Sequence, residues 1–342
     1  MEDYAGLILP LGKLPTEALK RVVLKYLGAE SKDVLLGPAP GEDGAVIRVG
    51  NKIVISSMDP ITGAVENIGW LAVNINANDV ATFGVKPSFF SSCILLPENS
   101  SEDTVEAICK QMDSAAERLG IAIIGGHTEV SPGLHRPIVI GCMMGVSELG
   151  RYVTSSSARP GNKIILTKSA GIEGTAILAK ERYDTLQVSI DKSLLESAKQ
   201  FYERISIVEE ALAAFNTGGV TAMHDPTEGG VAGGIHELAD ASNLGFKIIE
   251  NSIPVSRETL EICKFFGIDP LHLISSGALL ITADNLYVEA IMRNLAERGI
   301  NAAVIGEMLE DPEKRLIIRS DGSVGDLERP TFDHLWLALE NR

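Results

Sequence analysis

The stretch "MHDPTEGGVAGG", residues 223–234, sets a histidine, two acids, a threonine and a proline directly before a run of glycines. The residues just before it, 220–223, are typical of a strand, and Val231, Ile235 and Leu238 follow at helical spacing. The stretch therefore predicts a loop that leads from a strand into a helix over residues 230–243. A simple turn requires no pair of carboxylates beside a flexible backbone, so this loop indicates a functional site.

Four further loops carry an acid beside glycine, proline or a small polar residue. They are "GEDGAVI" (41–47), "SMDPITG" (57–63), "NINANDVATFG" (74–84) and "GGHTEV" (125–130), and their acids are Asp43, Asp59, Asp79 and Glu129. Each acid lies at the end of an expected strand or helix, where functional side chains collect. Any one of them alone is more simply a solvated turn residue, because Asp, Asn and Gly favour turns. Together they predict a gathered set of carboxylates.

Gathered carboxylates repel one another at neutral pH, and a hard divalent cation among them removes that cost. Magnesium suits such oxygen ligands and prefers to bind carboxylates together with substrate phosphates. The set therefore predicts a magnesium site that accepts a nucleoside triphosphate. The glycines of the same loops allow backbone N–H groups to approach phosphate oxygens.

The standard nucleotide and hydrolase motifs are missing from the sequence. The nearest approach to a phosphate-binding P-loop, "GLILPLGKL", has the wrong glycine spacing and a leucine where a hydroxyl is needed. "GGVAGG" does not match G-x-G-x-x-G, and no G-x-S-x-G stretch is present. A P-loop enzyme, a dinucleotide-binding dehydrogenase and a serine hydrolase are therefore not indicated.

Hydrophobic periodicity predicts two mixed α/β domains, residues 1–150 and 151–342, joined within the polar stretch 147–162. We expect helices over 66–82, 101–119, 207–215, 230–243, 257–266 and 286–298. We expect strands over 46–49, 53–57, 89–96, 121–124, 138–146, 163–167, 220–223, 246–249, 278–282 and 302–306, and a last strand pair around Asp321.

Composition limits the classes of partner and compartment. The chain has 342 residues, 45% of them hydrophobic, and a formal net charge of −16. That charge repels nucleic acid and anionic lipid, so we expect neither nucleic-acid nor membrane binding. Four cysteines lie far apart without a C-x-x-C pair, and the first ten residues lack the basic start of an export signal. We therefore expect reduced thiols and a cytoplasmic protein.

The five acidic motifs, in this order and at these separations, resemble the superfamily of aminoimidazole ribonucleotide (AIR) synthase, PurM, from about Leu9 onward. The superfamily also contains the hydrogenase maturation protein HypE, selenophosphate synthetase, thiamine-monophosphate kinase and formylglycinamide ribonucleotide amidotransferase. The resemblance implies an N-terminal PurM-like α/β domain that binds ATP and Mg²⁺ and forms a homodimer through its sheet. A C-terminal α/β substrate domain follows, and ATP lies in a cleft at the dimer interface.

The resemblance also implies roles for single residues. Asp43, Asp59, Asp79 and Glu129 occupy positions that resemble the family's metal and phosphate ligands. Gly125 and Gly126, which precede Glu129, belong to the expected nucleotide site. Asn76 belongs to it as well and helps to position the Asp79 loop. Lys13 is the last member, and its segment either covers ATP or lies on the surface.

Asp225 and Thr227 match the family's D-P-T-x-G-G loop, which implies that they face the transferring phosphoryl group. The alternative is that Thr227 caps the following helix while Asp225 sits in the turn. In the second half, "KSAGIEGTAILA" (168–179) resembles a glycine loop that borders the substrate, with Gly171, Glu173 and Gly174 as candidates. For the histidines at 127 and 224 we expect structural or hydrogen-bonding roles, because magnesium prefers oxygen.

The resemblance implies chemistry in which ATP phosphorylates an amide, a thiocarboxamide or a similar group to activate it. The general layout places the chain nearest to HypE, which works on a thiocarboxamide carried by its own C-terminal cysteine. This chain ends "LWLALENR" and its last cysteine is Cys263, so we expect a separate small-molecule or partner-borne acceptor, unless the sequence is trimmed. A small-molecule kinase of the thiamine-monophosphate type and a non-catalytic maturation subunit remain the alternatives.

Overall fold

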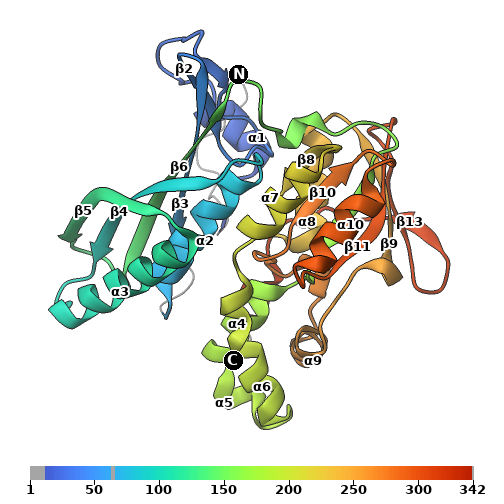
Figure 1. The fold of residues 1–342 in the computed structure, drawn as a ribbon. Helices are drawn as coiled ribbons and strands as arrows, with labels where there is room; N and C mark the ends of the chain where they lie inside the picture. Colours follow the sequence, from blue (N-terminus) through green and yellow to red (C-terminus); the bar gives the residue numbers. More distant parts are fainter. Residues whose placement is uncertain (1–11, 63–65, 341–342) are drawn as a thin grey trace, which may run out of the picture.

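The computed structural model describes residues 12–62 and 66–340 as two mixed α/β domains that lie side by side (Figure 1). The prediction made from the first ten residues concerns a segment outside these ranges. Gly63, the last residue of the second acidic motif, also lies outside them. Within them, no helix combines the length and the apolar character that crossing a membrane requires.

The first domain is built on a six-stranded sheet with the order β1-β2-β3-β6-β4-β5. All neighbouring strands are antiparallel except β4 and β5, which are parallel. The strands are β1 (Val34–Leu36), β2 (Ala45–Val49), β3 (Lys52–Ile61), β4 (Pro87–Leu96), β5 (Ala122–Val130) and β6 (Ile138–Glu148). β5 is therefore an edge strand, and its residues are exposed.

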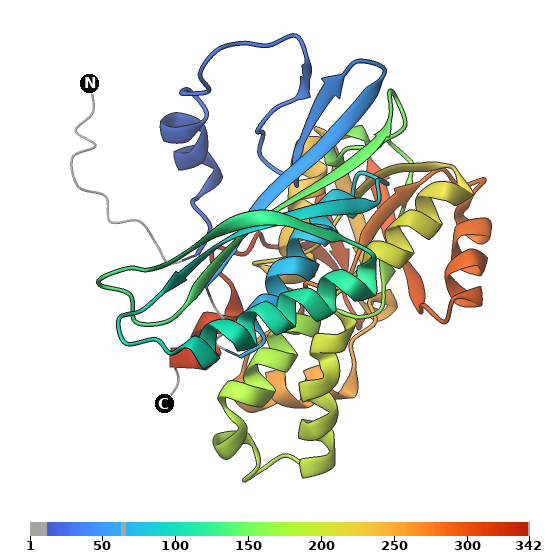
Figure 2. The same ribbon diagram turned by 60° about the vertical axis from the view of Figure 1, so that its left-hand side comes forward.

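Helices α2 (Ile68–Ala81) and α3 (Glu102–Leu119) cover one face of this sheet (Figure 2). α3 begins at the cap Ser101, whose hydroxyl accepts a hydrogen bond from Thr104 N at 3.3 Å, as the sequence predicts. α2 is buried almost completely, since it lies between the sheet and the second domain. Gly141 on β6 permits this approach, because a Cβ there would lie 2.4 Å from Asn76 Nδ2.

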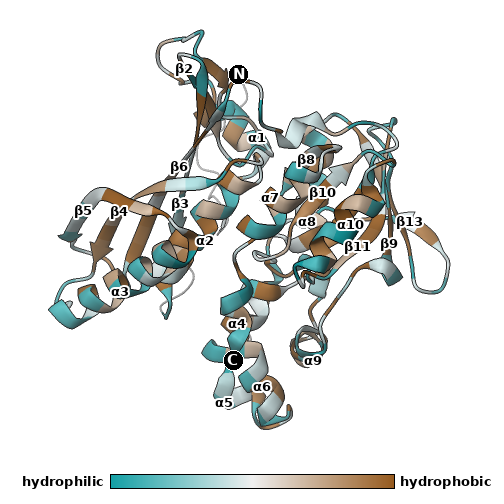
Figure 3. Cartoon of the chain, viewed as in Figure 1, coloured by the Kyte–Doolittle hydropathy of each residue, from teal (hydrophilic) through white to brown (hydrophobic). Residues whose placement is uncertain are grey.

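The opposite face of the first sheet carries apolar side chains that no helix of the described chain covers. Alternation along the strands puts Met58, Phe89 and Val146 on this face, and all three are exposed. Figure 3 shows hydrophobic residues along β4 and β6. An apolar sheet face of this kind indicates an interaction surface.

The second domain is built on a seven-stranded sheet with the order β13-β12-β9-β11-β7-β10-β8. Its strands are β7 (Lys163–Thr167), β8 (Val220–His224), β9 (Gly245–Ile249), β10 (Leu280–Ala283), β11 (Ala302–Leu309), β12 (Arg315–Ile318) and β13 (Val324–Asp326). Alternate residues of β7 enter different clusters, since Ile164 and Leu166 pack with α8 (Gly230–Ala241) while Ile165 packs with the cluster that reaches the first domain.

The other face of this sheet carries α7 (Val208–Thr217), on the side of the first domain, and α10 (Val288–Glu297), which packs on α7 (Figure 1). A group of helices lies below the sheet in the same view: α4 (Ile172–Glu181), α5 (Tyr183–Leu186), α6 (Lys192–Lys199) and α9 (Arg257–Phe266). The short α1 (Thr16–Ala18) precedes the first sheet and α11 (His334–Glu340) follows the second. The expected fold class and the expected long elements are confirmed. The expected domain boundary at residues 150 and 151 stays a prediction in the segment between β6 and β7.

The two domains are joined by hydrogen bonds of two side chains of α2, Asn78, which is buried, and Trp70, which is partly buried. Asn78 Nδ2 donates to Ile205 O and Asn78 Oδ1 accepts from Ile207 N, both at 2.9 Å. Trp70 Nε1 donates to Tyr202 O at 3.0 Å. Because these bonds satisfy buried backbone groups of the second domain, they fix the position of α2 against it.

Candidate functional site

The loop of residues 225–229 lies between β8, which ends at His224, and α8, which begins at Gly230. Gly230 has φ +63°, and a Cβ there would lie 2.5 Å from Leu271 O. Glycine is therefore needed for both the left-handed backbone and the close approach. Gly229 N donates to Asp333 Oδ2 at 2.7 Å, which holds the end of the loop in place.

Four of the five acidic loops converge on one cavity of about 440 Å³, which we call the acid cavity. Asp43 enters it before β2, Asp59 from β3 and Asp79 from α2, while Asp225 enters from the loop after β8. Six of the site residues predicted from the sequence line this cavity: Lys13, Asp43, Asp59, Asp79, Asp225 and Thr227. Residues far apart in the sequence, and from both domains, therefore meet at one place.

Asn76 holds Asp59 through the backbone. Asn76 Oδ1 accepts a hydrogen bond from Asp59 N at 2.9 Å, and Asn76 Nδ2 donates to Asp59 O at 3.2 Å and to Ala72 O at 2.9 Å. The side chain is completely buried. The structure thus gives Asn76 a positioning contact with the Asp59 strand, whereas the sequence predicted one with the Asp79 loop.

Asp79 is 5% exposed, and its Oδ2 accepts a short hydrogen bond of 2.5 Å from Ser57 Oγ. Burial raises the pKa of Asp79 well above its usual value, and the charges of Asp59 and Asp225 add to the shift. Burial likewise raises the pKa of Asp225 to about 8 and raises that of Asp59. The cluster therefore holds negative charge poorly unless a cation shares it.

His224 is clamped between two acids and is 3% exposed. Its Nδ1 lies 2.8 Å from Asp43 Oδ1 and its Nε2 lies 2.9 Å from Glu237 Oε2. Burial lowers the pKa of His224, but the two carboxylates outweigh burial and raise it well above the usual value. The two carboxylates thus favour the protonated imidazole, and the contact of its Nε2 with Glu237 agrees with the expected hydrogen-bonding role.

Lys13 brings the one lysine ammonium that lines the acid cavity. The residue as a whole is exposed, while its Nζ donates to Thr227 Oγ1 at 2.8 Å and its backbone N donates to Glu228 Oε2 at 2.8 Å. Glu237 raises the pKa of Lys13, as do Asp59 and Asp43, against the opposing effect of burial. In return Lys13 and His224 overcome burial and lower the pKa of Glu237 to about 2. The side chain therefore lies at the cluster and is not a remote surface lysine.

The alternative role of Thr227 as a helix cap is wrong. Gly229 is the N-cap of α8, and no side chain among the described residues caps it. The Thr227 hydroxyl instead accepts from Lys13, so the side chain lies in the cavity, as its expected role at the reacting group requires.

The carboxylates fit a cation by their unmet hydrogen-bonding capacity. Among the described residues, Asp43 Oδ2 and Asp225 Oδ2 are buried without a hydrogen-bond partner. Buried carboxylate oxygens left in this way are costly, and a divalent cation satisfies them. Within the same described ranges no group of three or more His, Cys, Asp or Glu side chains is drawn close enough together to hold a metal by itself. A cation bound here would accordingly need water or phosphate oxygens as further ligands.

Gly125, Gly126 and Glu129 lie elsewhere, on the exposed edge strand β5. Glu129 accepts from Ser131 Oγ at 2.5 Å and lies 3.0 Å from His127 Nε2. None of the three lines the acid cavity of its own chain. Their proposed part in nucleotide binding consequently requires a second copy of the chain.

A second cavity of about 450 Å³, which we call the side cavity, adjoins the first. Lys13, Asp59 and Thr227 line both cavities. The side cavity is otherwise lined by Gly12, Pro60, Ile61, Thr62, Ile75, Arg136, Glu173, Ile177, Glu228, Ile274, Ser276, Asp333, Leu335 and Trp336. A group bound in either cavity can therefore reach the same three side chains.

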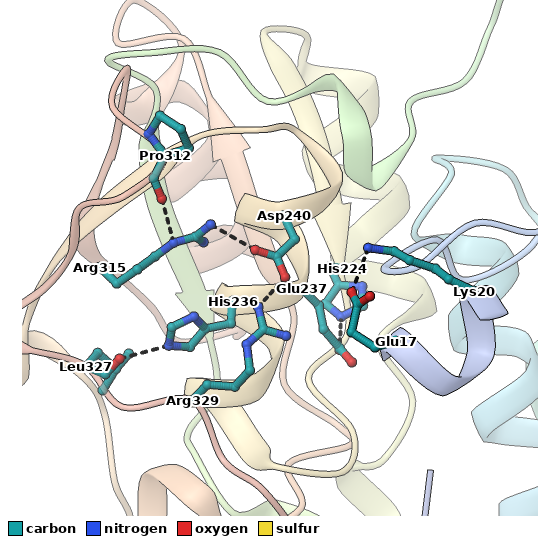
Figure 4. A network of polar contacts seen from close by, with 10 residues as sticks. All are labelled: Glu17, Lys20, His224, His236, Glu237, Asp240, Pro312, Arg315, Leu327 and Arg329. Carbon is teal, nitrogen blue, oxygen red and sulfur yellow. Dashed lines mark hydrogen bonds and ion pairs between the residues drawn. The ribbon is translucent and has the colours of Figure 1, made fainter. Parts of the chain in front are cut away.

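Glu237 is a site residue that the sequence analysis missed. It lies on α8, seven residues beyond Gly230, and contacts His224 (Figure 4). The sequence carried a signal for it, because Glu237 is seven positions from Gly230 and residues at this spacing lie on one face of a helix. Farther along the same helix Asp240 pairs with Arg315 and Arg329, away from the cavity.

Comparisons with known proteins agree with this arrangement. The AIR synthase related protein N-terminal domain matches residues 41–147, and the AIR synthase related protein C-terminal domain matches residues 159–319. A putative hydrogenase expression/formation protein of Methanocaldococcus jannaschii is 32% identical over 302 residues, which are 86% of this chain and 88% of that protein. The carbamoyl dehydratase HypE of Rhizobium leguminosarum bv. viciae is 29% identical over 79% of this chain and 78% of its own length.

Solved structures show the same fold. A HypE–HypF complex has a chain that matches with a TM-score of 0.75 and 22% identity, over 92% of this chain and 99% of that one. HypE in complex with ATP matches with a TM-score of 0.71 and 22% identity, over 96% and 98%. The thiamine-monophosphate kinase of Stenotrophomonas maltophilia K279a matches with a TM-score of 0.65 and 23% identity, over 86% of this chain and 93% of that one. The chain belongs to the AIR synthase related family and is HypE-like.

Proposed function

We propose that this member of the AIR synthase related family is an ATP- and Mg²⁺-dependent enzyme that phosphorylates the oxygen of an amide, a thiocarboxamide or a similar group. The observation that carries the proposal is the acid cavity, where Asp43, Asp59, Asp79 and Asp225 meet Lys13 beside a second cavity. Relatives named carbamoyl dehydratase HypE and a HypE structure with ATP support it.

The acids and Lys13 have complementary tasks in phosphoryl transfer. Asp43, Asp59 and Asp79 would hold Mg²⁺, and the ion would neutralise part of the phosphate charge. Lys13 adds a fixed positive charge at Thr227, where the two cavities meet. Because Asn76 fixes the Asp59 backbone and Ser57 fixes Asp79, these side chains are oriented before substrate binds.

The reaction that fits is activation of a poor electrophile. The acceptor oxygen forms a bond to the γ-phosphorus, the bond from that phosphorus to the β–γ bridging oxygen breaks, and ADP leaves. The phosphorylated oxygen is then a good leaving group. Loss of protons from the amide nitrogen with departure of phosphate gives a nitrile, which is a dehydration. The acceptor is a small molecule or a group on a partner protein.

The protein acts as a homodimer in this proposal. The uncovered face of the first sheet exposes Met58, Phe89 and Val146, and the edge strand β5 lies beside it. Pairing of two such faces covers the apolar surface and brings Gly125, Gly126 and Glu129 toward the acid cavity of the partner subunit. The β5 residues then complete the nucleotide site in the other copy.

A non-catalytic role explains the site poorly. Burial of several acids raises their pKa values and leaves carboxylate oxygens without partners, and a structural subunit gains nothing from this cost. The alternative of a small-molecule kinase of the thiamine-monophosphate type shares the acid cavity but requires a phosphate acceptor. The side cavity is lined by four acids, Asp59, Glu173, Glu228 and Asp333, against two cations, Lys13 and Arg136, and this balance favours the alternative less.

The test is ADP release measured with Mg²⁺ and ATP, with and without primary amides. We expect Asp59→Asn to lower the rate by about 10²-fold, since a preorganised charge at the reacting group is lost. Asp113→Asn, an exposed acid on α3, is the matched control and should behave as wild type. Equal rates and equal ATP affinity for wild type and Asp59→Asn would remove the support for an enzyme.

A further inference from the structure

The loop "GEDG" before β2 touches the second domain at its first three residues. A Cβ on Gly41, whose φ is +79°, would lie 2.8 Å from Glu237 O, so the backbone of the loop packs directly on α8. Asp43 Oδ1 lies 2.8 Å from His224 Nδ1 at the end of β8. The residue between them, Glu42, has no part in the phosphoryl transfer proposed above, yet it makes the third contact.

Glu42 uses both carboxylate oxygens to bind the segment that joins the domains. Its Oε2 accepts a hydrogen bond from Ser155 N and its Oε1 accepts one from Ser156 N, both at 3.1 Å. These N–H groups begin a short 3-10 helix, η2 (Ser155–Ser157), and the first N–H groups of a helix have no partner inside it. A carboxylate from the first domain therefore caps the start of η2.

The helix η2 is in turn anchored to the elements that carry the other site residues. Ser155 is buried, and its Oγ donates to Met223 O of β8 at 3.1 Å. Ser242, at the end of α8, donates from its Oγ to Ser155 O at 2.8 Å and accepts from Ala158 N at 3.2 Å. The Glu42 carboxylate is thus connected to both β8 and α8 through one turn.

The other end of the loop is fixed to the first sheet. A Cβ on Gly44 would lie 2.8 Å from Ser56 O of β3, and β2 begins at the next residue. Asp43 therefore stands between an attachment to the first sheet and an attachment to the second domain. Because the chain is held on both sides of Asp43, the place of its carboxylate depends on both attachments.

Glu42 also lines the acid cavity, but both of its oxygens already accept N–H groups. Asp43 and Asp225 each keep one buried oxygen without a hydrogen-bond partner in the described part of the chain. Asn78 and Trp70 join the domains through α2, whereas Glu42 joins them through the loop that carries Asp43. The Glu42 contact therefore acts on the position of this one carboxylate.

We propose that Glu42 is a positioning residue, which sets Asp43 in the acid cavity by binding η2 and thereby strengthens the binding of a divalent cation. The inference rests on the proposed function, since Asp43 is one of the residues that would hold Mg²⁺. Glu42 itself does not contact the ion in this role. Ser242 supports the same position at one remove, because it holds the turn that Glu42 binds.

Binding of Mn²⁺ to the full chain, followed by the paramagnetic resonance of the free ion, tests the proposal without ATP turnover. We expect Glu42→Ala to weaken Mn²⁺ binding by about tenfold and Ser242→Ala to weaken it by a smaller factor. The double variant should match Glu42→Ala, because Ser242 acts through the same contact. Glu148→Ala, which removes an exposed carboxylate paired with Lys52, is the matched control and should bind Mn²⁺ as wild type does.

Hydrogen–deuterium exchange reports the contact itself. In the metal-free protein, Glu42→Ala should exchange faster than wild type in a peptide that contains Ser155 and Ser156, and Glu148→Ala should not. Thermal melts show whether each variant folds. Glu42→Gln keeps one acceptor oxygen and provides the same two measurements if Glu42→Ala does not fold.

The outcomes separate this inference from the proposed function. Unchanged Mn²⁺ affinity in Glu42→Ala, losses that add in the double variant, or no Mn²⁺ binding by wild type overturns the inference. A loss of affinity without faster exchange at Ser155 would make Glu42 a ligand of the ion, which overturns it as well. Mn²⁺ binding that depends on Glu42, in a protein that releases no ADP with any amide, upholds the positioning role and overturns the proposed enzyme. ADP release that depends on Asp59, with unchanged Mn²⁺ affinity in Glu42→Ala, does the reverse.

Discussion

Lys13 is the residue on which the charge of the acid cavity depends. Its ammonium contacts Thr227 Oγ1 and lies among Asp43, Asp59, Asp225 and Glu237, which raise its pKa. Because the cation lowers the pKa of Asp59 and Glu237 in turn, its removal makes the cluster harder to ionise. Lys13 contacts Thr227 and Glu228, which lie more than 200 positions away in the sequence. The local sequence pattern therefore left the role of this lysine open.

Replacing Lys13 with methionine tests that dependence. We expect Lys13→Met to lower the rate of ADP release by about 10²-fold, since a fixed charge beside the transferred group is lost. Lys20→Met is the matched control, because Lys20 forms a surface pair with Glu17 at 3.1 Å. Steady-state kinetics with ATP give the comparison, and equal losses in both variants would contradict a specific role for Lys13.

His236 gives a prediction for stability against pH. It is 4% exposed, packs edge-on against Phe246 and has Nε2 2.9 Å from Leu327 O (Figure 4). Burial is the largest cause that lowers its pKa from 6.5 to about 4. The charges of Arg329 and Arg315 act in the same direction, while the hydrogen bond to Leu327 O and the charge of Asp240 oppose the shift. The folded state therefore binds fewer protons than the unfolded state between these values.

The sign follows from that difference. The contribution of neutral His236 is fully present above pH 6.5 and is lost as the pH falls toward 4, by about 3 kcal/mol in total. His236→Gln keeps a donor for Leu327 O and does not titrate, so it is the reference. Urea unfolding across this pH range should show wild type losing stability relative to the variant; parallel curves would mean that His236 titrates normally.

The turn from β8 into α8 is the element that assembles the acid cavity, and Gly230 is its tightest point. A Cβ there would lie 2.5 Å from Leu271 O, at φ +63°. We expect Gly230→Ala to destabilise the fold by about 2 kcal/mol or more, from backbone strain and the clash together. Gly161→Ala, at φ +81° with no atom within 4 Å of its Cβ, measures the strain alone. Chemical denaturation compares them, and equal losses would show that the clash relaxes.

Elements were predictable where the chain repeats a period over many residues. The stripe on α3 and the alternation on β6 identified both, because one face of each is buried. Short elements such as β1, α5 and α11 carry too few periods to be recognised. The segment "GIEGTAILA" resembles a glycine loop in sequence, yet it is helical from Ile172. Gly174 is needed there for packing and not for a turn, because a Cβ at this position would clash with Leu273.

The site was predictable in its acids but not in their partners. Asp43, Asp59, Asp79 and Asp225 stand beside turn residues, and that local signal survives in a single sequence. The contacts with Ser57, Asn76 and Glu237 depend on how strands and helices pack, which no local pattern records. Glu129 carries the same local signal as the four aspartates, yet it lies on the exposed β5.

At the scale of the whole molecule, the acid cavity lies where two domains and, in our proposal, two subunits meet. Asn78 and Trp70 fix one domain against the other through Ile205, Ile207 and Tyr202. Asp79 of α2 and Asp59 of β3 thereby lie in one cavity with Asp225 of the loop after β8. Within residues 12–62 and 66–340, β5 does not line this cavity, so the nucleotide site that we propose needs a second copy to include β5.

Phe89 tests the proposed assembly, since it is exposed on the uncovered sheet face, on β4. We expect wild type to have the mass of a dimer in light scattering and Phe89→Glu to have that of a monomer, because pairing would bury two opposed carboxylates. Leu286→Glu places the same charge on an exposed apolar residue of the second domain and should remain dimeric. The monomer should lose most of its ADP release while keeping its fold, since the residues of β5 no longer reach a partner's acid cavity. A monomeric variant with full activity would show that each chain completes its own site.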